Sequence, residues 1–207
     1  LILSTATTVF AWAVGATSLD AVNPLVAGDH AQAFRLALGA YRGLTDALDD
    51  PARRRDLCLA AFLQNRAEDD GQTFVVRGPF ASDYACATAL HLEFPNLKQG
   101  ESTAVVHAAT VRLAERVGPA QARGPAEALG VWRDGMDAAA AAEAVAGELE
   151  AIYQKAGMPI RLRDLGIARD ALPTVAARTV KIFNASGDLT TPEDRVARSL
   201  AILERAW

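Results

Sequence analysis

The side chains best suited to catalysis or metal binding are scattered along this chain of 207 residues. Its three histidines, His30, His91 and His107, lie far apart, and none has a partner at metal-ligand spacing such as i+4. The two cysteines, Cys58 and Cys86, are too few for a disulfide framework or a zinc cluster. Taken singly, each histidine is better explained as a surface or core residue than as a ligand. These residues alone assign no reaction to the chain.

The sequence motifs that hold phosphate groups or build familiar catalytic centres are missing. The chain has no GxGxxG or GxxxxGK[ST] loop, and no HExxH, CxxC or GxSxG sequence. The run Arg53–Arg55 is best interpreted as a solvated helix face, and Asp69-Asp70, which precede a glycine, as a solvated turn. No nucleotide-binding or hydrolytic function follows from a motif.

Composition and charge describe a folded domain without a nucleic-acid or membrane partner. With 51% hydrophobic and 22% charged residues, the chain is not intrinsically disordered and can bury a real core. Its net charge of −4 lacks the basic character that nucleic acid or an anionic membrane attracts. Residues 1–19 are uncharged, but they lack the basic start of a signal peptide, and serine and threonine interrupt what a span needs, about 20 apolar residues. We expect a buried helix there and, given the few cysteines, a cytoplasmic location.

The helical pattern extends over almost the whole sequence. Alanine, leucine, arginine and glutamate dominate, so the expected fold class is all-α: a single helical domain of about eight to nine helices. Proline suits a first helical turn, where its missing N–H is not needed, and predicts helix starts at Asn23-Pro24, Asp50-Pro51 and Thr191-Pro192. Asp137 is expected to begin a long alanine-rich helix that ends at Gly157.

Further expectations concern single elements. Thr73–Val76 is the one segment predicted as a strand, and Pro125–Trp132 is predicted as a short helix. In the helix expected after Pro24, the apolar positions fit one helical face, formed by Leu25, Phe34, Leu38, Tyr41 and Leu48. The apolar part of the helix after Pro51 is expected to contain Leu57, Leu59, Ala60, Phe62 and Leu63.

Five segments, in order along the chain, carry a resemblance to a known family. They are Asp20–Pro24 (DAVNP), Asp49–Leu63, Leu97–Val106 (LKQGESTAVV), Lys155–Gly166 (KAGMPIRLRDLG) and Glu204–Trp207 (ERAW). Together they are similar to the C-terminal helical domain of the iron-containing alcohol dehydrogenases, also described as dehydroquinate-synthase-like, and the maleylacetate reductase branch is nearest. The resemblance implies that residues 1–207 form this one domain.

The resemblance also implies how a cofactor would reach the chain. In that family each protomer has an N-terminal α/β domain that binds NAD(P) and a C-terminal helical domain that holds a divalent metal, usually iron or zinc, beside the substrate. This chain resembles the second domain alone, so we expect the nucleotide-binding domain to be absent from it, either removed or on a separate chain. The resemblance thus implies no cofactor in this chain and NAD(P) held through a partner domain. The partner is then a protein that carries a nucleotide-binding domain, or else the chain forms a homo-oligomer.

The family's four metal ligands fall on residues that bind divalent metals poorly. By the resemblance, an acidic residue and a histidine one turn apart correspond to Thr8 and Trp12, and two histidines about fourteen residues apart correspond to Ala85 and Gln99. A further histidine of the family falls on Ala89. Because a divalent catalytic metal needs imidazole or carboxylate donors, no metal site is expected.

Two interpretations of the former metal cleft follow. Either it has become core, with the Trp12 indole filling the space of the metal, or a pocket survives. A surviving pocket is expected to be lined by Thr8, Trp12, Asp83, Tyr84, His91 and Gln99. Asp83 and His91, eight residues apart, would share one helix face, and Tyr84 or His91 is the candidate catalytic proton donor.

Three functions are compatible with these observations. The first is a helical subunit or domain of a metal-free, maleylacetate-reductase-like oxidoreductase, in which nucleotide binding appears only when the other half is present. The second is a non-catalytic structural partner of a homologous enzyme, which predicts normal activity when Thr8, His91 and Gln99 are each changed to alanine. The third is an enzyme or small-molecule binder that reuses the old cleft, whose ligand binding Trp12→Ala would abolish.

Overall fold

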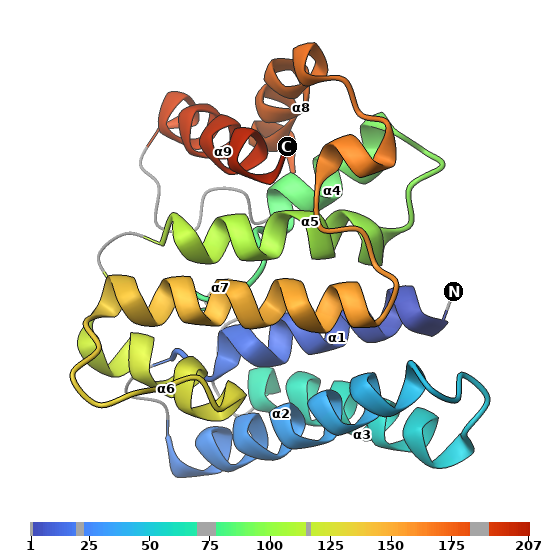
Figure 1. Ribbon diagram of the computed structural model, residues 1–207, viewed down its shortest axis with the longest axis vertical. Helices are drawn as coiled ribbons and strands as arrows, with labels where there is room; N and C mark the ends of the chain where they lie inside the picture. The colour runs from blue at the N-terminus through green and yellow to red at the C-terminus, as the bar shows by residue number, and fades with distance from the viewer. Residues whose placement is uncertain (1, 20–22, 70–77, 115–116, 183–190) are drawn as a thin grey trace.

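The computed structural model describes residues 2–19, 23–69, 78–114, 117–182 and 191–207. Within them the chain forms α-helices and short 3-10 helices and no strand, as the predicted all-α class requires (Figure 1). The α-helices are α1 (Ile2–Ala16), α2 (Pro24–Leu44), α3 (Pro51–Asp69), α4 (Tyr84–Glu93), α5 (Gln99–Arg112), α6 (Pro119–Leu129), α7 (Ala138–Lys155), α8 (Leu172–Arg178) and α9 (Pro192–Ala206). The 3-10 helices are η1 (Leu162–Leu165), η2 (Arg169–Ala171) and η3 (Thr179–Lys181).

The predicted helix starts are confirmed. Pro24, Pro51 and Pro192 are the first residues of α2, α3 and α9. Asn23 caps α2, because its side chain accepts hydrogen bonds from two backbone N–H groups of the first turn, each at 3.0 Å. Asp137 caps the long helix α7 in the same way, at 2.8 Å. These capping residues fix where each helix begins, and so which side chains face inward.

Helix α5 is the centre of the fold. Its residues from Ser102 to Val111 are all buried, so it has no solvent-facing side over that length. Its two faces belong to different apolar cores. Ala104 and Ala108 pack into a larger core with α1, α2, α3, α6 and α7, whereas Val105 and Val106 pack into a smaller core with α4, α8 and α9. In Figure 1 the helices of the smaller core lie above α5 and those of the larger core below it.

Helix α1 crosses the start of α5 at very short range. The Ser4 hydroxyl accepts a hydrogen bond from the backbone N–H of Gly100 at 2.8 Å. A Cβ at position 100 would lie 2.3 Å from the Ser4 carbonyl oxygen, so the two backbones can approach this closely because residue 100 is glycine. This crossing sets the spacing between α1 and α5.

Two predicted elements need comment. The sequence predicts a helix from Pro125, but α6 begins at Pro119, because Gly118 and Pro119 form its N-cap and first turn and Pro125 is accommodated inside it. The predicted strand Thr73–Val76 lies outside the described residues.

The apolar positions predicted for the helices after Pro24 and Pro51 are only partly buried, and Leu48 lies beyond the end of α2. The larger side chains Leu25, Leu48, Leu59 and Phe62 are exposed. Alanines occupy much of the inner surface instead, among them Ala33, Ala37, Ala40 and Ala60, which are all fully buried. Small residues let the helices pack closely, so the larger apolar residues of the pattern lie to the side of the contact.

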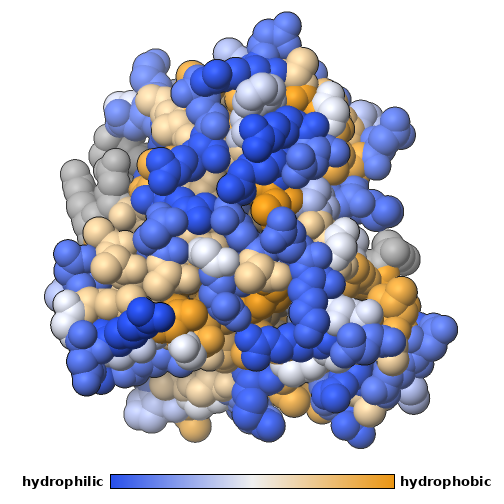
Figure 2. Space-filling model, in the orientation of Figure 1, coloured by the Kyte–Doolittle hydropathy of each residue, from blue (hydrophilic) through white to orange (hydrophobic). Residues whose placement is uncertain are grey.

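The visible surface in Figure 2 is mostly hydrophilic, with small apolar patches between the polar side chains. Among the described residues, no helix combines the length and the apolar character needed to cross a lipid bilayer.

Candidate functional site

A cavity of about 220 Å³ opens where α1 meets the start of α4 and the start of α5. By volume it could hold roughly seven water molecules, and thus a small organic molecule. Its walls are formed by residues from α1, α3, α4, α5 and the segment before α4. They are Thr8, Val9, Ala11, Trp12, Gln64, Ala81, Ser82, Tyr84, Ala87, Gln99 and Thr103. We refer to this space as the α1–α5 cavity.

Four of the six residues predicted for a surviving pocket lie together in the α1–α5 cavity. Thr8 and Trp12 are one turn apart on α1, Tyr84 is the first residue of α4, and Gln99 is the first residue of α5. Residues 8 and 99 are thus brought to one space by the crossing of α1 over α5.

The expectation that Asp83 also lines this pocket needs correction. Asp83 is the N-cap of α4, and its Oδ1 accepts the backbone N–H of Cys86 at 2.8 Å. Its Oδ2 accepts a hydrogen bond from Nη2 of Arg195 at 2.7 Å, in an ion pair with both side chains buried. Capping and ion pairing draw the carboxylate into the helix packing, away from the cavity.

His91 does not line the cavity either. Its Nδ1 lies 2.6 Å from the backbone oxygen of Leu97, and because a carbonyl oxygen only accepts, Nδ1 carries the proton. The histidine sits in the last turn of α4, far along the helix from Tyr84 at its start. It holds the loop between α4 and α5 by this contact.

Three polar residues of the cavity have no signal in the sequence. Gln64 comes from α3, and its amide donates to the Val9 carbonyl at 2.9 Å. Ser82 lies in the segment before α4 and Thr103 on α5, and the Ser82 hydroxyl donates to the Thr103 carbonyl at 3.1 Å. Only the tertiary packing of α3 and α5 against α1 brings these side chains to the cavity.

The three aliphatic hydroxyl groups of the cavity wall, those of Thr8, Ser82 and Thr103, act as hydrogen-bond acceptors toward a ligand. Thr8 donates its proton to the Thr5 carbonyl at 2.7 Å, and Thr103 donates to the Gln99 carbonyl at 2.9 Å. Ser82 donates to the Thr103 carbonyl, as described above. Since a hydroxyl has one proton, each oxygen keeps lone pairs but has no further proton to give.

Among the described residues that line the cavity, none carries a formal charge at neutral pH. Tyr84 is the one of these residues with an ionisable side chain, and it is half-buried. Tyr84 and Gln99 each begin a helix, so the N-terminal ends of α4 and α5, with their partial positive charges, border the space. The described wall of the cavity is therefore polar but uncharged.

Trp12 is held in the cavity wall by aromatic packing. Its ring meets the His30 ring edge to face, with centroids 5.5 Å apart. His30 is buried, and neither ring nitrogen has a hydrogen-bond partner among the described residues; burial lowers its pKa, against the opposing effect of Asp29. Asp29 is itself paired with Arg66. The neutral His30 ring thus packs against the Trp12 indole and supports it in the cavity wall.

The side chains at the positions that the resemblance assigns to the metal ligands do not suit iron or zinc. Thr8, Trp12 and Gln99 line the cavity, and Ala85 is buried on α4 beside it. An indole and a methyl group offer no lone pair to a divalent metal, and a neutral hydroxyl and amide are weak ligands. Across the described parts of the chain, no three His, Cys, Asp or Glu side chains gather closely enough to hold a metal.

Comparison with known proteins decides the family. The model of the Fe-containing alcohol dehydrogenase family, C-terminal domain, matches residues 3–207. The chain belongs to this family. No curated protein sequence matches it. The resemblance seen in the five sequence segments is confirmed at the level of this domain.

Solved structures share the fold of this iron-dehydrogenase domain. The alcohol dehydrogenase from Oenococcus oeni superposes with a TM-score of 0.79 at 20% identity, covering 100% of this chain and 51% of that one. A 1,3-propanediol oxidoreductase gives 0.75 at 22% identity, covering 99% and 51%. Sulfoacetaldehyde reductase from Bifidobacterium kashiwanohense, in complex with NAD+, gives 0.68 at 16% identity, covering 98% and 50%. The chain spans about half the length of each.

Proposed function

We propose that this domain is the substrate-binding half of a metal-independent oxidoreductase, with the α1–α5 cavity as its substrate site. The observation that carries the proposal is the coincidence of two features. A cavity opens at the positions that the family resemblance assigns to the metal centre, and the residues at these positions, Thr8, Trp12 and Gln99 in the cavity wall and Ala85 beside it, are all neutral. Donors of this kind do not fit iron or zinc, so no step is assigned to a metal.

The domain then needs a nucleotide-binding half, on the same protein or on a protein partner. The similar solved structures are twice as long, and one is in complex with NAD+. A nicotinamide held by that half would supply or accept the hydride. We propose a cytoplasmic location for the assembly, which suits a chain with two cysteines that are both free.

The hydrogen-bonding pattern of the cavity favours an uncharged substrate that donates hydrogen bonds. The hydroxyl oxygens of Thr8, Ser82 and Thr103 can only accept, which suits a substrate with O–H groups. A dicarboxylate such as maleylacetate would bring its own acceptors against them, and the described part of the cavity wall has no cationic side chain to pair with it. A small hydroxylated aldehyde or ketone, and the corresponding alcohol, fits this wall best.

Tyr84 is the residue we assign to proton transfer. It is the one ionisable side chain among the described residues of the cavity wall, and its phenol can donate to a carbonyl oxygen as the hydride reaches the carbonyl carbon. The carbonyl then gains one hydride and one proton, and the half-buried tyrosine recovers its proton from solvent. The adjoining end of α4 stabilises negative charge as it develops on the oxygen.

The first experiment is native mass spectrometry of the intact protein, followed by NAD(P)H binding and carbonyl reduction. We expect a nucleotide-binding half to accompany the domain and reduction to be unaffected by a chelator. Tyr84→Phe should lower kcat/KM roughly 100-fold, since general acid catalysis contributes about 10²–10⁴-fold. Tyr41→Phe, a matched change in the core, should leave activity within about twofold. Loss of activity on metal removal would contradict the proposal.

A second candidate is a non-catalytic partner subunit, favoured by the alanines at Ala85 and Ala89 where the family has histidines. In that case the same assembly retains full activity in Tyr84→Phe and in Trp12→Ala, because the reaction takes place on another chain. If instead the isolated domain binds a hydroxylated ligand without nucleotide, and Trp12→Ala abolishes this, the cavity serves binding alone.

A further inference from the structure

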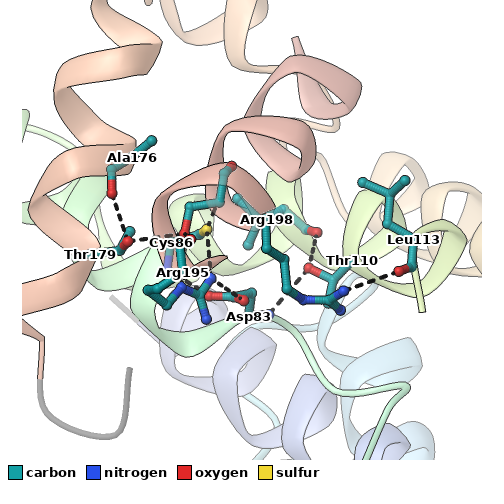
Figure 3. A network of polar contacts seen from close by, with 10 residues as sticks. Asp83, Cys86, Thr110, Leu113, Ala176, Thr179, Arg195 and Arg198 are labelled. Atoms are coloured by element: carbon teal, nitrogen blue, oxygen red, sulfur yellow. Dashed lines mark hydrogen bonds and ion pairs between the residues drawn. The ribbon is translucent and has the colours of Figure 1, made fainter. Parts of the chain in front are cut away.

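A buried polar network joins the last helix to the start of α4 (Figure 3). Arg195 of α9 extends its guanidinium to Asp83, with Nη2 2.7 Å from Oδ2. The same side chain donates from Nε to the Ser199 hydroxyl at 2.9 Å and from Nη2 to the Cys86 sulfur at 3.7 Å. The side chains of Asp83 and Arg195 are each 8% exposed. A full ion pair is thus enclosed in the smaller core.

Asp83 stands between two residues of the α1–α5 cavity. Ser82 and Tyr84, its neighbours in the chain, both line the cavity, whereas the Asp83 side chain is directed to α9. Its Oδ1 also caps α4 through the Cys86 N–H, so one carboxylate fixes both the helix start and the link to α9. The orientation of Tyr84 therefore depends on a residue that does not touch the cavity.

The segment 82–84 is held from two sides. On the α5 side, the Asp83 N–H donates to the Thr110 hydroxyl at 3.3 Å, and the Ser82 hydroxyl donates to the Thr103 carbonyl. On the α9 side, Arg195 binds the Asp83 carboxylate. Removing the α9 contact leaves the α5 contacts in place, so the segment can rotate without unfolding.

A buried ion pair contributes little net free energy to the stability of a fold. The desolvation of both charges offsets much of their attraction, and an apolar pair of similar volume is often as stable. A directional ion pair does, however, fix one geometry, which apolar contact does not. The directionality of the Asp83–Arg195 ion pair therefore suits a role in positioning neighbouring residues better than a role in stability alone.

We infer that Asp83 and Arg195 are positioning residues that hold Tyr84 at the α1–α5 cavity, so that helix α9 controls the geometry of a site it does not line. This inference rests on the proposed function for its effect on catalysis. The orientation of Tyr84 itself can be measured without any activity.

The test labels the intact protein with 3-fluorotyrosine and records fluorine NMR spectra. The chain has three tyrosines, Tyr41, Tyr84 and Tyr153, and a Tyr84→Phe variant identifies the signal of Tyr84. The principal variant combines Asp83→Asn with Arg195→Met. It removes both charges together, so no unpaired charge stays buried, and asparagine still caps α4.

The matched control is Arg198→Met. Arg198 is on the same helix, but its guanidinium donates to the Leu113 carbonyl at 3.3 Å and lies away from Asp83 (Figure 3). A conservative variant, Arg195→Lys, keeps a positive charge beside Asp83 without the guanidinium fork, and also serves if the double variant does not fold.

In the double variant we expect the Tyr84 signal to move or split, while the Tyr41 and Tyr153 signals keep their positions. Arg195→Lys should give a smaller change of the same signal, and Arg198→Met none. With the nucleotide-binding half present, kcat/KM of the double variant should fall about tenfold or more, as misplacement of a reacting group predicts.

Two results would overturn the inference: a Tyr84 signal unchanged in both the double variant and Arg195→Lys, or a change of equal size in Arg198→Met. Failure of the proposed function gives a different result. The Tyr84 signal would then respond as expected, although the unaltered protein reduces no carbonyl compound.

Discussion

The two cores on either side of α5 each enclose a polar network, and the two networks differ in charge. In the larger core, His107 of α5 donates from Nε2 to the Phe80 carbonyl at 2.9 Å and accepts from the Tyr153 hydroxyl at Nδ1, at 2.7 Å. In the smaller core, Asp83 and Arg195 form a full ion pair. Both networks join segments that are distant in the sequence. The His107 network does so with neutral dipoles, and the Asp83–Arg195 network with charges.

The difference in charge predicts how each network fails. A neutral histidine with one donor and one acceptor satisfied costs little to bury, but it resists protonation, and burial lowers the pKa of His107 to about 4. The ion pair cannot lose one partner without leaving a buried charge. Acid should therefore weaken the larger core first, and mutation should damage the smaller core most.

The largest expected effect is the loss of one member of the ion pair. Asp83→Ala removes the cap of α4 and leaves the Arg195 cation buried, so the free energy of unfolding should fall by about 3–5 kcal/mol. Urea denaturation measures this loss. The double variant Asp83→Asn/Arg195→Met leaves no unpaired buried charge, so its free energy of unfolding should be close to that of the unaltered protein. A single Asp83→Ala variant as stable as the unaltered protein would contradict the expected difference between the two cores.

Acidification gives the next effect. The folded protein keeps His107 neutral with a pKa of about 4, whereas the unfolded chain binds a proton near its ordinary value of 6.5. The contribution of His107 is therefore complete above pH 6.5 and is lost as the pH falls toward 4, by roughly 3 kcal/mol in total. Chemical denaturation between pH 4 and 8 measures the slope.

His107→Gln is the control for that slope. Glutamine can also donate to the Phe80 carbonyl and accept from Tyr153, but it does not titrate. The part of the pH dependence that belongs to His107 should vanish in this variant. An identical slope in both proteins would assign it to other groups.

The smallest expected losses of stability come from two buried tyrosines of the larger core. Tyr153→Phe leaves Nδ1 of His107 without its donor and should lower the free energy of unfolding by about 1–3 kcal/mol. Tyr41→Phe removes a contact of 3.0 Å to the Thr7 hydroxyl, which still donates to the Leu3 carbonyl, and should cost about 0.5–1 kcal/mol. Thermal unfolding of both variants side by side tests the order.

Local chemistry made much of the fold predictable. Proline at the first helical turn and short polar caps act within one turn of the chain, so Pro24, Pro51 and Pro192 marked their helix starts correctly. Burial was less predictable, because it depends on which neighbour covers a face. Leu59 and Phe62 are exposed where α2 and α3 meet through alanines.

The candidate site was predictable only as far as the family pattern reached. Thr8, Trp12 and Gln99 were located through aligned positions, and the structure brings them to one cavity with Tyr84. Their role stays a prediction. No local pattern could have found the pairing of Asp83 with Arg195, which are 112 positions apart, because it depends on the packing of α9 against α4.

The contact between Ser4 and Gly100 has a consequence for protein engineering. Since backbone meets backbone there, the distance between α1 and α5 cannot be tuned by exchanging side chains, and any larger residue at position 100 would force the helices apart. The width of the cavity therefore has to be changed at other lining positions. Ala11, Ala81 and Ala87 line the cavity, so larger side chains at these positions are the changes to test for narrowing the space and rejecting bulkier molecules in steps.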